Sequence, residues 1–191
     1  MNGDARRPAA VRTVPLRAVL AFAPLLLLAS CEGGLLAPDD ADPAIRTSAD
    51  EYVLETTSIG WETQIPFTYV NRSAGPYYLV NCNGAYGFHL EKWIDGRWVL
   101  AYTPVLPACL SPVIRIDAGS LFPSSIAVFA GFPGTNWHPK FQIADPEGTY
   151  RIVLEALQSY DESGFPFGTD VPREERVSNE FRLGTADAPA D

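Results

Sequence analysis

Histidine is the side chain best suited to acid–base catalysis near neutral pH, and the 191-residue sequence contains two, His89 and His138. His89 alternates with apolar residues in an expected strand, which favours a structural or surface role. His138 lies in the turn-like stretch "TNWHPK". Neither has a second histidine or an acid at the spacing of a metal site, and the sequence has no Gly-x-Ser-x-Gly elbow. We therefore expect no metal, no cofactor and no enzyme activity.

Acidic residues are the remaining catalytic candidates, because two carboxylates from distant segments can converge in a fold. The acidic stretches "YDESG" and "REER" are more simply explained as solvated loop charges. An enzyme is therefore the weakest of the functions considered.

The aromatic side chains are better candidates for binding, since the sequence has 4 Trp, 8 Tyr and 10 Phe. Most of them are expected to fill the core. Trp98 alternates with Leu100 and is assigned to the core, whereas Trp93 shares a strand face with His89 and Trp137 lies in a loop. Trp93 and Trp137 are therefore the candidate ligand-binding residues, suited to stacking on sugar rings or anchoring a protein partner.

Segments with period-two alternation, which is typical of strands, must position these candidates. In "TQIPFTYVNRS" the residues Ile65, Phe67 and Tyr69 share one face. In "YGFHLEKWIDGRWVLAY" two alternating runs flank Asp95-Gly96, the strongest short-range signal for a hairpin with a type I′ turn.

Further short strands are predicted, and regular turn signals between them favour a sandwich. No stretch has a helical stripe bounded by caps. Residues 158–176 lack a strand pattern and are expected to form a long exposed loop. The further strands are expected at residues 52–57, 113–116, 125–129, 141–143, 149–157 and 177–183.

The N-terminal region has the order of an export signal. Four arginines precede an apolar run over residues 18–29, which is shorter than the roughly 20 residues that span a bilayer. The Arg6-Arg7 pair could indicate twin-arginine export, but it lacks the residues that usually flank such a pair. General secretion is therefore the preferred route.

The end of this apolar run, "LASC" over residues 28–31, resembles the lipobox of bacterial lipoproteins. The resemblance implies that residues 1–30 are a lipoprotein signal peptide and that Cys31 is the lipid-attachment residue of the mature chain. Glu32 follows where that family carries Asp in proteins kept at the inner membrane, so the bacterial outer membrane is favoured over the inner. The alternative is an ordinary signal with Cys31 left as a free thiol.

The mature chain is strongly acidic. It has 10 basic and 22 acidic residues, four Arg and one Asp fewer than the 14 and 23 of the full sequence, so its formal charge is −12. Such a chain is a poor nucleic-acid binder, and anionic lipid headgroups repel it, so its lipid would be its contact with the membrane. Residues 31–50 lack periodicity and are expected to form a flexible tether, and residues 185–191 a disordered tail.

Cys82 and Cys109 remain in a chain exported to an oxidising compartment. An even pair there is most simply a disulfide, which would close a loop of 26 intervening residues and contribute about 3–4 kcal/mol. A thiol metal site is the alternative, although a lone separated pair lacks zinc-type spacing.

Four stretches, "IPFTYVNRS", "LEKWIDGRWV", "PEGTYRIVLEAL" and "SNEFRL", resemble in their order the strands of bacterial immunoglobulin-like domains. The resemblance covers residues 51–184 and implies an all-β, immunoglobulin-like antiparallel β-sandwich of about seven to nine strands. Tyr150 is placed like the tyrosine corner of such sandwiches, whose hydroxyl bonds to the backbone upstream. The cysteines depart from the antibody disulfide positions, which favours a bridge between loops around the central hairpin.

These features predict an envelope lipoprotein, anchored to the membrane, with a non-catalytic binding or structural domain. Its expected partners are the membrane and an envelope protein or polysaccharide. A carbohydrate-binding module is one alternative, which requires Trp93 and Trp137 to be exposed and coplanar. An inhibitor of an envelope protease is another, with residues 158–176 as the candidate loop.

Overall fold

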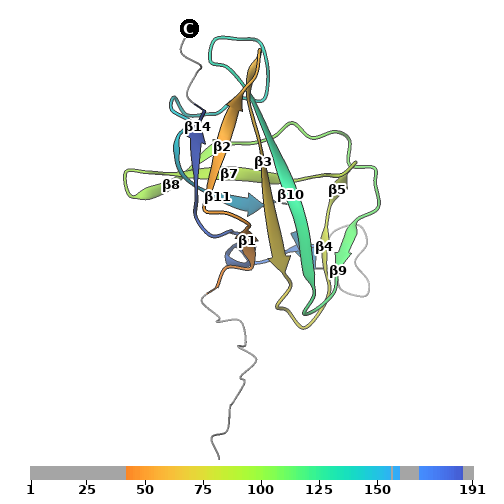
Figure 1. The fold of residues 1–191 in the computed structure, drawn as a ribbon. Helices are drawn as coiled ribbons and strands as arrows, with labels where there is room; N and C mark the ends of the chain where they lie inside the picture. Colours follow the sequence, from red (N-terminus) through yellow and green to blue (C-terminus); the bar gives the residue numbers. More distant parts are fainter. Residues whose placement is uncertain (1–41, 156, 160–167, 187–191) are drawn as a thin grey trace, which may run out of the picture. The chain divides into compact units, whose positions relative to one another are not determined.

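The computed structural model describes residues 42–155, 157–159 and 168–186, which form mainly antiparallel sheets arranged as a sandwich (Figure 1). The predicted all-β, immunoglobulin-like class is confirmed. Within these described residues, seven strands have five or more residues: β2, β3, β7, β8, β10, β11 and β14. The elements are β1 (Ile45–Thr47), β2 (Glu51–Thr56), β3 (Gly60–Val70), β4 (Tyr77–Leu79), β5 (Asn81–Cys82), β6 (Ala85–Tyr86), β7 (Phe88–Ile94), β8 (Arg97–Tyr102), β9 (Ile114–Ile116), β10 (Leu121–Gly131), β11 (Gly148–Leu154), β12 (Leu157–Ser159), β13 (Thr169–Asp170), the 3-10 turn η1 (Arg173–Glu175) and β14 (Phe181–Thr185).

Strands β1, β3 and β10 form one layer of the sandwich, and β14, β11, β7 and β8 form the other. Strand β2 connects these two layers. Its first part pairs in parallel with β14, and its last residues, Glu55 and Thr56, pair antiparallel with β3. The resulting sheet has the order β1-β3-β2-β14-β11-β7-β8, and β10 lies against β3 along its whole length. In Figure 1 the long β3 and β10 ribbons cross in front of β7 and β11. Smaller sheets, β13-β12-β4-β9 and β5-β6, complete the described domain.

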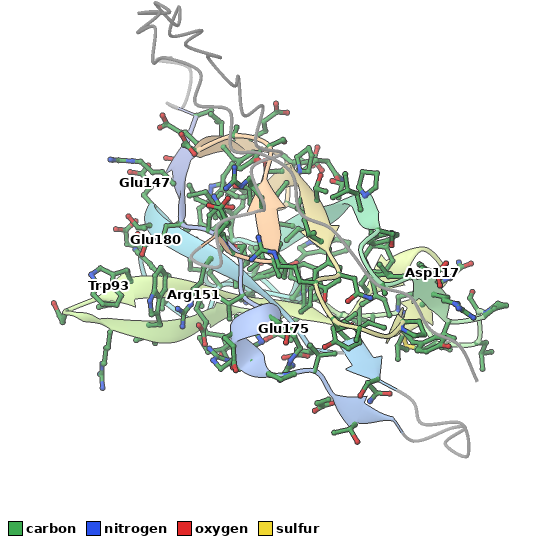
Figure 2. The ribbon with its side chains drawn as sticks, turned by 90° about the horizontal axis from the view of Figure 1, so that it is seen from below. Trp93, Asp117, Glu147, Arg151, Glu175 and Glu180 are labelled. Atoms are coloured by element: carbon green, nitrogen blue, oxygen red, sulfur yellow. A yellow bond between two sulfur atoms is a disulfide. The ribbon has the colours of Figure 1, made fainter. Side chains whose placement is uncertain are left out.

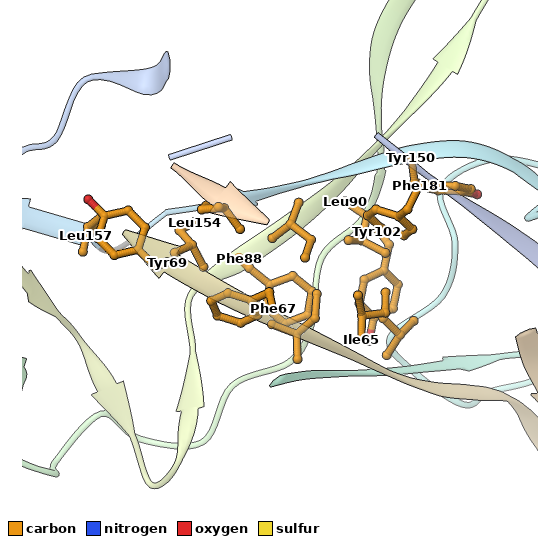
Figure 3. Close-up of a cluster of buried hydrophobic side chains, with 14 of the residues drawn as sticks. Ile65, Phe67, Tyr69, Phe88, Leu90, Tyr102, Tyr150, Leu154, Leu157 and Phe181 are labelled. Carbon is orange, nitrogen blue, oxygen red and sulfur yellow. The ribbon is translucent and has the colours of Figure 1, made fainter. Parts of the chain in front are cut away.

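The core lies between these layers (Figure 3). Ile65, Phe67 and Tyr69 of β3 are at most 2 % exposed and belong to the same cluster as Phe88 and Leu90 of β7. The alternation predicted for β3 is therefore confirmed. Burying such a side chain contributes about 1.5–3 kcal/mol, which is why the pattern of apolar residues determines the face that each strand turns inward.

Tyr150 forms the predicted tyrosine corner. Its hydroxyl donates a 2.6 Å hydrogen bond to the backbone carbonyl of Pro146, and both residues are buried. Burial raises the pKa of this phenol, so the hydroxyl remains a donor. Gly148 lies between them with φ 143°, and a Cβ there would lie 2.6 Å from Cε of Lys92. The backbone conformation therefore favours glycine at this position of the Gly-x-Tyr motif.

Tyr150→Phe is expected to lower the free energy of unfolding by about 1–2 kcal/mol, because the carbonyl of Pro146 loses its buried donor. Tyr69→Phe is the matched control, since Tyr69 is also 0 % exposed but its hydroxyl has no hydrogen-bond partner among the described residues. That change should shift stability by less than about 0.5 kcal/mol. Chemical denaturation measures both, and equal losses would contradict the role assigned to the Tyr150 hydrogen bond.

The predicted hairpin joins β7 to β8. Asp95 and Gly96 have φ values of 49° and 79°, the positive values that a type I′ turn requires. Aspartate tolerates this conformation better than most residues with a side chain, and glycine adopts it freely.

A register shift in this hairpin changes the face on which Trp98 lies. The pairing between β7 and β8 shifts between Leu90 and Glu91, which is the mark of a β-bulge. Tyr102 consequently points into the core at 1 % exposure, while Leu100 is 41 % exposed and Trp98 lies with it on the outer face. The assignment of Trp98 to the core is therefore wrong, because strict alternation does not anticipate the extra residue.

The folded domain extends past the predicted boundaries. Ile45 of β1 is fully buried and pairs with β3, so residues 44–50 belong to the domain and not to the tether. At the other end β14 continues to Thr185. A strand of three residues gives no periodic signal, since alternation is recognisable only over about four or more.

Three other predicted segments differ from the structure. Residues 141–143 are not a strand, and Phe141 instead packs its ring against Trp61 and Tyr102. Residues 149–157 divide into β11 and β12, which pair in different sheets. The stretch 158–176 is not one loop, because its described ends contribute to β12, β13 and η1.

Candidate functional site

The two candidate tryptophans are exposed and lie on different elements. Trp93 of β7 is 46 % exposed, and Trp137, in the connection between β10 and β11, is 52 % exposed. The Trp93 ring meets Trp98 with centroids 5.1 Å apart and planes at 60°, whereas the backbone of Trp137 lies against Gly131. The angle excludes a flat stacking platform on the β7–β8 hairpin, and within the described part of the chain no ring contact joins Trp93 to Trp137.

Beside Trp93, the outer face of the sheet carries a buried carboxylate between two arginines. Glu91 is 9 % exposed. Its Oε2 accepts a hydrogen bond from Nε of Arg151 at 2.8 Å and forms an ion pair with Nη2 of the same residue at 2.7 Å. Its Oε1 accepts a hydrogen bond from Nη2 of Arg173 at 2.6 Å. The Arg151 guanidinium also lies 4.2 Å from the centroid of the Trp98 ring. Figure 2 labels Arg151 and Trp93 on this part of the molecule.

The electrostatics of Glu91 favour a structural role. Burial raises the pKa of its carboxyl group, but the hydrogen bonds and charges of Arg151 and Arg173 outweigh burial and hold that pKa below its usual value. His89 adds contacts to Glu91 at 3.4 Å and Glu155 at 2.8 Å. An ionised carboxylate with both oxygens engaged cannot act as a general acid near neutral pH, and this cluster instead connects β7, β11 and η1.

Cys82 and Cys109 form the predicted disulfide. Cys82 ends β5 and is 1 % exposed, and Cys109 lies in the connection after β8. The bridge therefore joins the segments that precede and follow the β7–β8 hairpin, as expected from its departure from the antibody positions. Cys31 lies outside the described residues, so its lipid attachment stays a prediction.

The segments joined by the disulfide border a cavity of about 620 Å³, which we call the β10 cleft. This volume lies within the range of about 300–1,000 Å³ that is usual for ligand sites. The cleft is lined by Gln64, residues 83–86, Phe88, Tyr102, residues 104–106, residues 125–127, Phe129, His138 and Pro139.

The lining of the β10 cleft is uncharged apart from the titratable His138. Among the residues that the structure describes, it includes no Asp, Glu, Lys or Arg, in a chain whose formal charge is −9. Val105, on one wall, is 71 % exposed, and Leu110, next to Cys109, is 89 % exposed. Exposed apolar residues beside an uncharged cavity favour an apolar or neutral ligand over an ionic one.

One side of the cleft is the outer edge of β10. The hydroxyl of Tyr102 donates to the carbonyl of Phe129 at 2.8 Å and accepts from its N–H at 3.1 Å. The N–H of Gly131 donates to the carbonyl of Pro139 at 2.8 Å. At Phe129 and Gly131, the backbone groups on this edge therefore form hydrogen bonds with other segments, where a neighbouring strand would otherwise pair.

A second cavity, of about 590 Å³, lies over β2, β3 and β10 and contains the glutamates Glu51, Glu55 and Glu62. All three are exposed, and within the described part of the chain no His, Lys or Arg lines this cavity. Exposed carboxylates without a neighbouring base are typical of a solvated surface, so they do not favour the enzyme alternative.

Sequence reasoning missed the β10 cleft, because its lining comes from separate segments between Gln64 and Pro139 and none of them carries a motif. Two signals point to it indirectly. Pro123 precedes the predicted strand at residues 125–129, and proline in a sheet marks an edge. The cysteine pair also predicts that the segments around the central hairpin are held together.

Across residues 42–155, 157–159 and 168–186, no group of three or more His, Cys, Asp or Glu is placed to hold a metal ion. No helix in this part of the chain is long and apolar enough to cross a membrane. A scan against models of known protein families finds no match to the sequence, and a search of curated proteins finds no significantly similar one.

Proposed function

We propose that this chain is a bacterial envelope lipoprotein, anchored through Cys31, whose β-sandwich is a non-catalytic binding module. The β10 cleft is its recognition site. The uncharged cavity of about 620 Å³, bordered by segments that a disulfide joins, is the observation that carries this proposal. A cavity of this size and chemistry is suited to binding, while the ionised and fully engaged Glu91 is suited to holding the fold.

The anchor is supported by the resemblance of residues 28–31 to a lipobox. Cys31→Ser is expected to release the protein from the membrane fraction, because a serine cannot take the thioether-linked lipid that supplies the anchoring energy. Cell fractionation measures the release, and mass spectrometry of the wild-type N-terminal peptide measures the lipid. An unmodified Cys31 thiol in the wild-type protein would contradict the anchor.

Photocrosslinking in the native cells tests the binding site. A photoreactive amino acid replaces Val105 on the cleft wall, Trp93 on the outer hairpin face or Leu121, which is 66 % exposed and lines no described cavity. We expect a reproducible adduct from position 105 and none from position 121, with mass spectrometry identifying the attached molecule. Adducts from position 93 alone, or from none of the three positions, would contradict binding in the β10 cleft.

Carbohydrate binding at Trp93 is the second candidate, favoured by the 46 % exposure of that ring. A single exposed indole can stack on one sugar. A polysaccharide that binds the wild-type protein and Trp137→Ala but no longer binds Trp93→Ala is the result that this alternative predicts.

A further inference from the structure

We infer, resting on the proposed function, that the occupant of the β10 cleft is an extended, largely apolar peptide segment of another protein. The segment adds to the outer edge of β10 as a short strand. It pairs with the backbone of Ser125 and Ala127, the two cleft residues whose outward N–H and C=O groups have no partner among the described residues.

The direction of these backbone groups follows from two independent observations. In an antiparallel strand, the N–H and C=O of one residue point to the same side, and successive residues alternate sides. Phe129 and Gly131 bond to Tyr102 and Pro139, away from β3, so Ala127 and Ser125 point the same way. Separately, Ser125 lies opposite Pro66 of β3, and proline has no N–H with which to pair.

The free part of the edge is bounded on both sides. Pro123, the next outward residue toward the start of β10, has no N–H to donate. At the other end, the hydroxyl of Tyr102 already takes both backbone groups of Phe129. Ser125 and Ala127 therefore present two donors and two acceptors over about 7 Å, from the strand rise of about 3.4 Å per residue.

Another polypeptide backbone is the ligand that matches this pattern. Alternating donors and acceptors at strand spacing are complementary to an extended chain, which is how exposed sheet edges bind peptides. The apolar walls, including Val105 and Leu106, would cover side chains of that peptide. The described lining residues offer no Asp, Glu, Lys or Arg to pair with charged side chains.

A second copy of this chain is a poorer occupant. The free edge lies in a cavity whose other walls are residues 83–86 and 104–106, so a partner strand within a rigid sheet would have to bring its neighbouring strands past those walls. A single extended segment has no such neighbours. Pro123 also interrupts the long ladder that strand pairing between two copies of β10 would form.

The test uses short random displayed peptides selected on the full-length protein in detergent. The tightest binder is then synthesised with one backbone nitrogen methylated at a time. Methylation at alternate residues that pair with β10 should weaken binding at least about tenfold, and methylation between them should change it less than about twofold. Selection of no peptide, or a binder that tolerates methylation at every position, would overturn the inference.

A variant of the protein tests the same backbone hydrogen bonds by removing a donor from β10 and not from the peptide. Ala127→Pro removes one outward donor without removing a bond to β3, and should weaken peptide binding at least about tenfold. Leu121→Pro is the matched control, since it makes the same change on the same edge outside the cleft and should bind normally. If Ala127→Pro fails to fold, by circular dichroism, the methylation scan still decides the question.

The inference and the proposed function fail in different ways. If position 105 crosslinks a glycan or a lipid in cells while no displayed peptide binds, the cleft is the recognition site and the strand-addition inference is wrong. If position 105 crosslinks nothing and position 93 does, both are wrong.

Discussion

Glu91→Ala is expected to lower the free energy of unfolding by about 3 kcal/mol or more, because it leaves an arginine without its buried partner. The side chain of Arg151 is 20 % exposed and would lose both its hydrogen bond to the carboxylate and its ion pair with it. Arg173 is 49 % exposed, so solvent would compensate more of its charge. Glu155→Ala is the matched control, since Glu155 is 49 % exposed and contacts His89 alone in this cluster. Glu155→Ala should lower the free energy of unfolding by at most about 1 kcal/mol.

The same residue predicts part of the pH dependence of stability. The folded-state pKa of Glu91 is depressed, so its carboxylate contributes stability above the unfolded pKa of about 4.5, and this contribution is lost as pH falls through the folded-state pKa. The groups that face it are Arg151, Arg173 and His89. Glu91→Gln should therefore lose less stability than the wild type between pH 5 and pH 3, in urea denaturation at each pH. Parallel acid profiles would contradict this account.

Removing the disulfide has the other large expected effect. Cys82→Ala with Cys109→Ala should lower the free energy of unfolding by about 3–4 kcal/mol, because the unfolded chain regains the freedom of a closed loop. The two cysteines are 27 positions apart in sequence. Alanine is preferred to serine because Cys82 is 1 % exposed and a buried hydroxyl would need a partner.

The disulfide variant should also lose binding in the β10 cleft, since residues 83–85 and 104–106 would no longer be held together. Reduction of the wild-type protein is the control, and it should reproduce both losses. A variant that unfolds at the wild-type denaturant concentration would contradict the role given to this bridge.

Local pattern predicted the parts of the fold that depend on neighbouring residues. Ile65, Phe67 and Tyr69 are buried because period two is a property of any strand. Asp95-Gly96 turns because few other pairs accept two positive φ values. The tyrosine corner was predictable from Tyr150 two residues after Gly148, a local arrangement that resembles that of a family of sandwiches.

Features that depend on distant residues were not predictable. The register shift between Leu90 and Glu91 in the β7–β8 pairing places Trp98 on the outer face and not in the core. Nothing in the alternating sequences of these two strands indicates this shift. The cluster at Glu91 joins residues 60 and 82 positions away, Arg151 and Arg173. Each residue alone looks like a solvated charge, so no sequence signal separates a buried carboxylate from an exposed one.

The candidate site was likewise predictable only where it depends on neighbouring residues in the sequence. Trp93 and Trp137 are exposed, as predicted, because one lies on a polar strand face and the other in a connection. The β10 cleft depends on which edge of β10 remains unpaired, and that is decided by the pairing of the whole sheet. Pro123 marks β10 as an edge strand, but no pattern in the sequence indicates which segments enclose the cleft.

Hydrogen exchange of single backbone amides, followed by NMR, distinguishes peptide recognition at the edge of β10 from recognition at Trp93. In the free protein the amides of Ser125 and Ala127 should exchange rapidly, while those of Ile126 and Val128, which face β3, should be protected. With a selected peptide bound, Ser125 and Ala127 should become protected as well. Protection of these two amides in the free protein, or peptide-induced changes confined to Trp93 and its neighbours, would contradict recognition at the edge of β10.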